Sequence, residues 1–177
     1  ATAMALAQAQ REACDPLGNP PSEIVAGFLF LGDCDNACST TQLRHFGIIG
    51  LLNVTINEGL GDKFGVSRCF LRAHDAEDQN IADLFTPACS FIDGIKAQGG
   101  RVLVHCMAGR SRSASLVIAY MMRTFKLPLH EAYLHVKQAS FLLGLQMAMC
   151  NSSVSQNKHL GQAPDPAKPG LLAAAGG

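Results

Sequence analysis

The feature that most constrains the fold of this chain is a strand, a short loop and a helix that follow one another between residues 101 and 125. Arg101–His105 is a mostly apolar run of strand length, and Ser113–Phe125 is long and apolar enough for a central helix. The loop between them, "CMAGRSR", holds one glycine and two arginines. Backbone N–H groups of such a loop and of the helix N-terminus point at one spot, so this unit predicts an anion-binding site.

The rest of residues 22–138 alternates between predicted strands and predicted helices. Two short strands are expected around a turn at Gly27, and buried or partly buried strands over Ile48–Val54 and Val66–Leu71. Apolar residues recur at helical spacing over Ala82–Gln98. This alternation predicts an α/β fold on a mostly parallel sheet. Two further helices are expected, a short one that Ser39 caps and one opened by Pro128 with Tyr133, Leu134 and Val136 on one face.

Length and composition indicate one domain with a tail at each end. A chain of 177 residues can bury one sizeable core and is short for two. Residues 1–21 lack periodicity and end in "GNPP", which predicts a flexible leader. Residues 22–150 form the predicted domain, and the polar and Pro-, Ala- and Gly-containing residues 151–177 predict a disordered tail.

Charge and cysteine usage argue against several classes of protein. Lys plus Arg and Asp plus Glu both number 14, which argues against a nucleic-acid partner and against a polybasic membrane module. The longest apolar runs, such as Leu116–Met122, are too short to span a bilayer. Seven cysteines without a CxxC pair indicate neither a disulfide framework nor a metal site. We therefore expect reduced thiols, no metal, and a cytoplasmic or nuclear location.

Cys106, the first residue of the loop, is the predicted nucleophile. The field that favours a bound anion also favours a thiolate, and thiols beside cations at helix N-termini can have pKa values of roughly 3.5–7.5 instead of about 8.5. Arg112 can reach back over the loop, and its planar guanidinium suits two oxygens of a phosphoryl group. Ser113 is expected to hydrogen-bond the thiolate, and His105 to fix the loop by hydrogen bonding rather than to attack.

A thiolate, a guanidinium and a nest of N–H groups together suit a phosphate monoester. The cysteine would form a phosphocysteine, and the leaving alkoxide or phenoxide would need a proton. The acidic loop after Val66–Leu71 offers the acid: Asp75 lies nearest the end of the strand and is favoured, with Glu77 and Asp78 as rivals. The same residue would activate water in a second step, and this chemistry needs no metal or cofactor.

The spacing His105-Cys106, five residues, Arg112-Ser113 resembles the signature of cysteine-dependent protein tyrosine phosphatases. The longer stretch "VLVHCMAGRSRSASLVIAYMM" is similar to dual-specificity phosphatases, in particular to MAP kinase phosphatase catalytic domains of the plant or algal kind. The resemblance extends over roughly Ser22–Gln138 and includes "SEIVAGFLFLGD", "LLNVT" and "HDAEDQNIADLF". It implies the cysteine phosphatase fold, a five-stranded sheet flanked by helices, with a shallow pocket for phosphotyrosine and phosphothreonine.

The same resemblance implies nucleophile Cys106, phosphate-binding Arg112, helper Ser113 and general acid Asp75. It also implies a phosphorylated protein substrate, with a MAP kinase as a candidate. The phosphate-binding loop that it implies consists of His105, Cys106, Met107, Ala108, Gly109, Arg110, Ser111 and Arg112.

Two departures from the family pattern leave alternatives open. Position 110 is Arg where many relatives have an apolar residue, which adds positive charge at the rim of the pocket. After "VKQ" the chain reads "ASFLLGLQMAMCNSS" without the family's Pro-Asn pair, so whether residues 139–150 form the closing helix stays open. The alternatives to a protein phosphatase are a phosphatase of non-protein phosphates, such as phosphoinositides, and a phosphate-binding pseudophosphatase.

Overall fold

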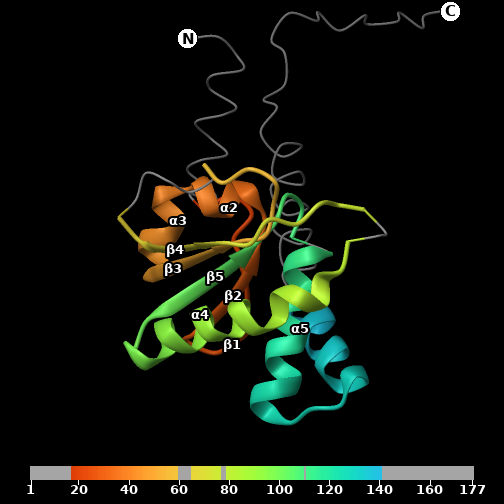
Figure 1. Cartoon of the computed structure of the whole chain (residues 1–177). Helices are drawn as coiled ribbons and strands as arrows, with labels where there is room; N and C mark the ends of the chain where they lie inside the picture. The colour runs from red at the N-terminus through yellow and green to blue at the C-terminus, as the bar shows by residue number, and fades with distance from the viewer. Residues whose placement is uncertain (1–16, 60–64, 77–78, 110, 141–177) are drawn as a thin grey trace, which may run out of the picture. The chain divides into compact units, whose positions relative to one another are not determined.

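Five strands form one sheet at the centre of the fold, in the order β1-β2-β5-β3-β4 (Figure 1). β1 pairs antiparallel with β2, whereas β2 with β5, β5 with β3 and β3 with β4 are parallel. The predicted α/β fold on a mostly parallel five-stranded sheet is confirmed. The strands are β1 (Ser22–Val25), β2 (Leu29–Gly32), β3 (Ile48–Asn53), β4 (Ser67–Phe70) and β5 (Arg101–His105).

The computed structural model describes residues 17–59, 65–76, 79–109 and 111–140. The chain divides into two units, residues 1–143 and 144–177, and all of the described residues belong to the first. Most of the predicted leader and all of the predicted tail therefore lie outside the described residues, and the domain boundaries stay predictions. Residues 17–21 of the leader are described, and the carbonyls of Leu17 and Asn19 accept hydrogen bonds from Gln42.

Helices cover both faces of the sheet. α2 (Cys34–Cys38) and α3 (Thr40–His45) lie on one face, and α4 (Phe85–Ala97) and α5 (Arg112–Phe125) lie on the other (Figure 1). A further helix begins at residue 129 and continues to residue 140, where this described range ends. Within the described ranges, no helix combines the length and the apolar character needed to cross a bilayer.

Side-chain alternation along the central strand divides the core between the two faces. Val102 and Val104 of β5 pack in the larger apolar cluster with α4 and α5, whereas Leu103 packs in the smaller cluster with α2 and α3. All three side chains are fully buried. Because β5 is covered on both faces, its sequence is a continuous apolar run rather than an alternating one.

The parallel strands end at the same level. Gly32 and Asn53, the last residues of β2 and β3, are both opposite His105, the last residue of β5. Phe70, which ends β4, is opposite Asn53. The chain segments that follow these four strands therefore emerge at one edge of the sheet, the edge where open α/β sheets bind ligands.

The helices differ from the sequence prediction at two places. α2 was not predicted, because five residues are too few to show a helical period; Asp33 and Asn36 hold its start in a reciprocal capping box. The predicted helix Ala82–Gln98 begins as the 3-10 turn η1 (Ile81–Leu84), and α4 itself begins at Phe85.

The face assigned to the helix after Pro128 was partly wrong. Val136 is buried as predicted, but Tyr133 and Leu134 are 47% and 38% exposed. The buried stripe instead joins Ala132 and Val136, which are four residues apart and therefore on one side of a helix. Ala132, which is smaller than the predicted Tyr133, thus faces the core.

The contact between α4 and β3 generates a prediction. A β-carbon on Gly50 of β3 would lie 2.6 Å from Cγ1 of Ile95, whereas one on Gly94 of α4 would meet nothing within 4 Å. Gly50→Ala should therefore lower the free energy of unfolding by about 1–3 kcal/mol through overpacking. Gly94→Ala, the matched control, should raise it by about 0.5–1 kcal/mol. Urea denaturation of both variants measures the difference, and equal midpoints would contradict this packing.

Candidate active site

Cys106 follows β5 directly and its thiol is enclosed by the loop that leads into α5. The residue is only 2% exposed. The sulfur accepts hydrogen bonds from the backbone N–H of Gly109 at 3.2 Å and from the hydroxyl of Ser113 at 3.1 Å. Burial by itself raises the pKa of the thiol, but hydrogen bonds from Ser113 and from the backbone of Gly109 and Ala108 outweigh it, and the pKa of Cys106 is lowered. The site therefore favours the thiolate.

The turn after β2 packs against the loop between β5 and α5. Gly109 has φ +66°, and a β-carbon there would lie 2.8 Å from the carbonyl oxygen of Gly32. Both the backbone conformation and the close approach require glycine. The N–H of Cys34 donates to the carbonyl of Met107 at 3.4 Å, so the start of α2 and the loop are joined directly.

Arg112, the first residue of α5, is held by the segment that follows β4. Its Nη1 donates to the carbonyl oxygen of Ala73 at 3.0 Å, and its Nη2 lies 3.4 Å from Oδ2 of Asp75. The residue is 7% exposed, and its Nε has no hydrogen-bond partner among the described residues. The guanidinium is therefore held through Nη1 and through one N–H of Nη2, and the N–H of Nε and the second N–H of Nη2 can bind two oxygens of a phosphoryl group.

Among the described residues, Asp75 is the acidic residue that lies beside Arg112. Its side chain is 71% exposed, so the ion pair with Arg112 is largely solvated and contributes little to stability. Exposure leaves the carboxyl free to reach a substrate above the loop. Its predicted rivals Glu77 and Asp78, like Arg110 of the loop, lie outside the described residues.

The hydrogen-bonding role of His105 stays a prediction. The residue is fully buried, and neither ring nitrogen makes a hydrogen bond of normal geometry to a described residue. Its link to the neighbouring strand is through the backbone, where its carbonyl accepts from the N–H of Val54 at 2.9 Å. Burial lowers the pKa of the ring to about 4, against a smaller opposite effect of the Cys106 backbone. The imidazole is thus buried and neutral beneath the loop.

The sequence did not reveal two of the supporting contacts. The Ala73 carbonyl that anchors Arg112 is a backbone group, so no side-chain motif in the sequence predicts this contact. The turn at Gly32 carries a local signal, because Asp33 and Asn36 have the spacing of a capping pair. Met107, Ala108 and Ser111 lie between β5 and α5, and their part in phosphate binding stays a prediction.

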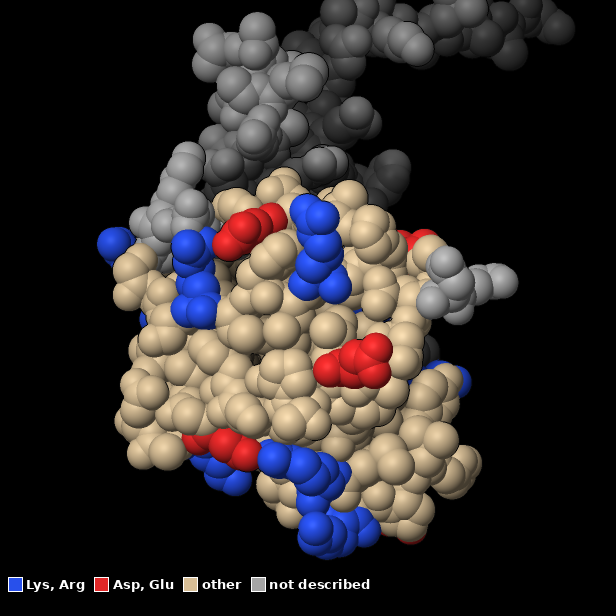
Figure 2. All heavy atoms as spheres, in the orientation of Figure 1, with Lys and Arg blue, Asp and Glu red and all other residues tan. Residues whose placement is uncertain are grey.

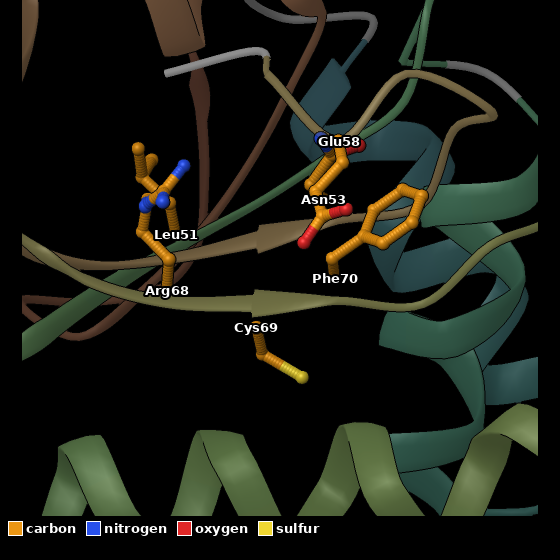
Figure 3. Close-up of a pocket in the computed structure, with 6 residues that line it drawn as sticks. All are labelled: Leu51, Asn53, Glu58, Arg68, Cys69 and Phe70. Atoms are coloured by element: carbon orange, nitrogen blue, oxygen red, sulfur yellow. The ribbon is translucent and has the colours of Figure 1, made fainter. Parts of the chain in front are cut away.

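A small pocket lies away from the thiol, beside the end of β3. Its volume is about 100 Å³, and neither Cys106 nor Arg112 borders it. Figure 3 shows Asn53 and Phe70 on the same side of the sheet, while Cys69 points toward α4. The residues that line it are Leu51, Asn53, Glu58, Arg68, Cys69 and Phe70.

Charges on the visible face are mixed, in keeping with the balanced composition. Figure 2 shows acidic and basic side chains interspersed on a mostly uncharged surface. The lowered pKa of Cys106 therefore has local causes, the hydrogen bonds from loop N–H groups and from Ser113. Among the described residues, no group of three or more His, Cys, Asp or Glu side chains is placed to hold a metal ion.

The buried imidazole generates a prediction on pH. Between pH about 6.5 and about 4 the unfolded chain binds a proton at residue 105 that the folded protein does not bind. The contribution of His105 to stability is therefore fully present above pH 6.5 and is lost as the pH falls toward 4. Denaturant titrations from pH 8 to pH 4 should show this decline, weakened in His105→Gln and unchanged in the exposed control His130→Gln. A His105→Gln profile identical to that of the wild type would contradict it.

The family profile described as "Dual specificity phosphatase, catalytic domain" matches residues 29–152. Dual specificity protein phosphatase 1-B of Xenopus laevis is 40% identical over 131 residues, which are 71% of this chain and 35% of that protein. Human dual specificity protein phosphatase 1 is 41% identical over 118 residues, 67% of this chain and 32% of that protein.

Solved structures agree with the sequence relatives. The human tyrosine phosphatase-like serine/threonine/tyrosine-interacting protein superposes with a TM-score of 0.62 at 32% identity, over 70% of this chain and 85% of that one. Human DUSP28 gives 0.65 at 26% identity, over 77% and 95%. The chain spans about a third of the length of the curated relatives that it matches. Its fold, its loop and these matches together establish that the chain belongs to the dual specificity phosphatase family, whose catalytic domain it matches.

Proposed function

We propose that this chain is a protein phosphatase that hydrolyses phosphotyrosine and phosphoserine or phosphothreonine through a phosphocysteine intermediate. The observation that carries the proposal is the environment of the Cys106 sulfur, which accepts hydrogen bonds from Gly109 and Ser113 at the N-terminus of α5. A buried thiol held in this way is a nucleophile near neutral pH.

In the first step, the thiolate of Cys106 attacks phosphorus in line with the ester bond. The sulfur–phosphorus bond forms as the bond from phosphorus to the side-chain oxygen breaks. Arg112 and the loop N–H groups bind the three remaining oxygens, on which charge is concentrated in the transition state. Asp75 donates its proton to the departing oxygen, so the product leaves as an alcohol or a phenol.

In the second step, the phosphocysteine is hydrolysed. The carboxylate of Asp75 takes a proton from water, and the water oxygen attacks phosphorus. The sulfur–phosphorus bond breaks with its electron pair on sulfur, and inorganic phosphate departs. The hydroxyl of Ser113, 3.1 Å from the sulfur, stabilises the leaving thiolate.

The substrate is proposed from kinship. The sequence relatives are named dual specificity protein phosphatases, which supports a phosphorylated protein as substrate. A MAP kinase is a candidate because of the resemblance described above. No contact among the described residues, which leave out Arg110, favours phosphoinositides, and the presence of Cys106, Arg112 and Asp75 speaks against a pseudophosphatase. We also propose a cytoplasmic or nuclear location, which the free thiols of the five described cysteines support.

Removal of the nucleophile tests the mechanism. Cys106→Ser should lower kcat on p-nitrophenyl phosphate by more than about 1000-fold, because a serine hydroxyl at this position stays protonated. Arg112→Ala should lower kcat and raise KM, because the guanidinium contacts phosphate in both the ground state and the transition state. Cys38→Ser, at an exposed free cysteine of α2, is the matched control and should keep the wild-type rate. Turnover by Cys106→Ser at the original rate would falsify the mechanism.

The dependence of the rate on the leaving group tests the role of Asp75 as general acid. Asp75→Asn should slow phenyl phosphate by about 100-fold or more, and p-nitrophenyl phosphate much less, because only a poor leaving group needs its proton during bond breaking. The acidic substitution control is Asp83→Asn, at an exposed position in η1. Steady-state rates on both esters give the comparison. If Asp75→Asn retains the wild-type rate on phenyl phosphate, the acid is Glu77 or Asp78.

A further inference from the structure

A closed ring of hydrogen bonds lies at the end of β3. The hydroxyl of Thr55 donates to Oδ1 of Asn53 at 2.8 Å, Nδ2 of Asn53 donates to the carbonyl of Asn57 at 2.8 Å, and the N–H of Asn57 donates back to Oγ1 of Thr55 at 3.0 Å. Thr55 is fully buried and Asn53 is 4% exposed. Each polar group of the ring has a partner, so the ring holds the chain from residue 53 to residue 57 in one conformation.

The ring fixes the backbone that receives the segment after β4. The carbonyl of Asn53 accepts from the N–H of Leu71 at 2.9 Å, and the carbonyl of Thr55 accepts from the N–H of Ala73 at 3.1 Å. The parallel pairing of β3 with β4 thus continues beyond both strands. The position of Ala73, which is fully buried, is therefore set by the conformation of Thr55.

Ala73 in turn joins the catalytic groups. Its carbonyl accepts the hydrogen bond from Nη1 of Arg112, and Asp75 follows two residues later with its carboxyl 3.4 Å from Nη2. Both the guanidinium and the acid are therefore placed by one short piece of backbone. The segment after β3 also contacts β5, because the N–H of Val54 donates to the carbonyl of His105, the residue before the nucleophile.

We propose that Thr55 and Asn53 are positioning residues of the phosphatase reaction. They touch neither the substrate nor the reacting atoms; they act through Ala73 on the placement of Arg112 and Asp75. The inference rests on the proposed function, since it assigns to these two residues the alignment of groups that the reaction uses. Loss of the ring frees the 71–76 segment, so the carboxyl no longer meets the leaving oxygen and the guanidinium binds phosphate less well.

The test uses the ratio of the rate on phenyl phosphate to the rate on p-nitrophenyl phosphate. This ratio does not change when a fraction of the protein molecules is inactive. Thr55→Val removes the hydroxyl and keeps the shape of the side chain. It should lower the rate on phenyl phosphate about tenfold more than the rate on p-nitrophenyl phosphate, because misplacement of the acid affects the poor leaving group. The inhibition constant of inorganic phosphate should rise as well, because the anchor of Arg112 is loosened. Thr55→Ser, which keeps the hydroxyl, should restore both values.

Two further variants keep the outcome decisive. In an Asp75→Asn background, Thr55→Val should leave the ratio unchanged, since the group that it places is absent. Thr86→Val, at an exposed position in α4, is the matched control and should behave as wild type. Should Thr55→Val not fold, Asn53→Ala breaks the same ring at a side chain that borders an open pocket (Figure 3).

The outcomes separate this inference from the proposed function. A Thr55→Val protein with lower activity, an unchanged ratio and unchanged inhibition by phosphate would overturn the positioning role and leave the phosphatase mechanism intact. Full activity of Cys106→Ser would overturn the mechanism itself, whatever the ratio. A shifted ratio that Thr55→Ser restores, absent in the Asp75→Asn background, supports the inference.

Discussion

The shared end level of three parallel strands is the constraint on which the site depends. Gly32, Asn53 and His105 stand opposite one another, so the chain leaves β2, β3 and β5 at one edge of the sheet. The loop that begins at Cys106 is joined to the turn after β2, where Cys34 donates to the carbonyl of Met107, and the residue before the loop, His105, accepts from Val54 after β3. A shift of one residue in either pairing would turn the side chains of that strand to the other face and separate these contacts.

A balance between burial and hydrogen bonding decides the chemistry of the groups placed there. Burial disfavours charge on both Cys106 and His105, but hydrogen bonds outweigh burial only at the thiol, so the pKa of Cys106 is lowered and the thiolate is favoured, whereas the imidazole stays neutral. Arg112 is buried and charged, and it is held by a backbone carbonyl together with an exposed carboxylate. The site thus holds one thiol with a lowered pKa and one cation, and the carboxyl of Asp75 lies at its solvated rim.

Much of the fold and the centre of the site could be predicted from the sequence because their signals are local. The run before Cys106 and the apolar helix after Arg112 are read directly from residue periodicity, and both elements are confirmed. Asp75 was favoured because it follows a strand, and the structure brings it to Arg112. The hydrogen-bonding role of His105 could not be judged in this way, since it depends on which atoms of other segments surround the ring.

The sequence by itself determined that Cys106 and Arg112 share one strand–loop–helix unit, because spacing, glycine and apolar runs act within a few neighbouring residues. Only the tertiary structure decided what holds that unit. The carbonyl of Ala73 anchors a guanidinium 39 residues away, and the ring at Asn53 and Thr55 sets the position of Ala73. Such partners depend on strand register, and register follows from the packing of the whole core rather than from the preference of any short segment.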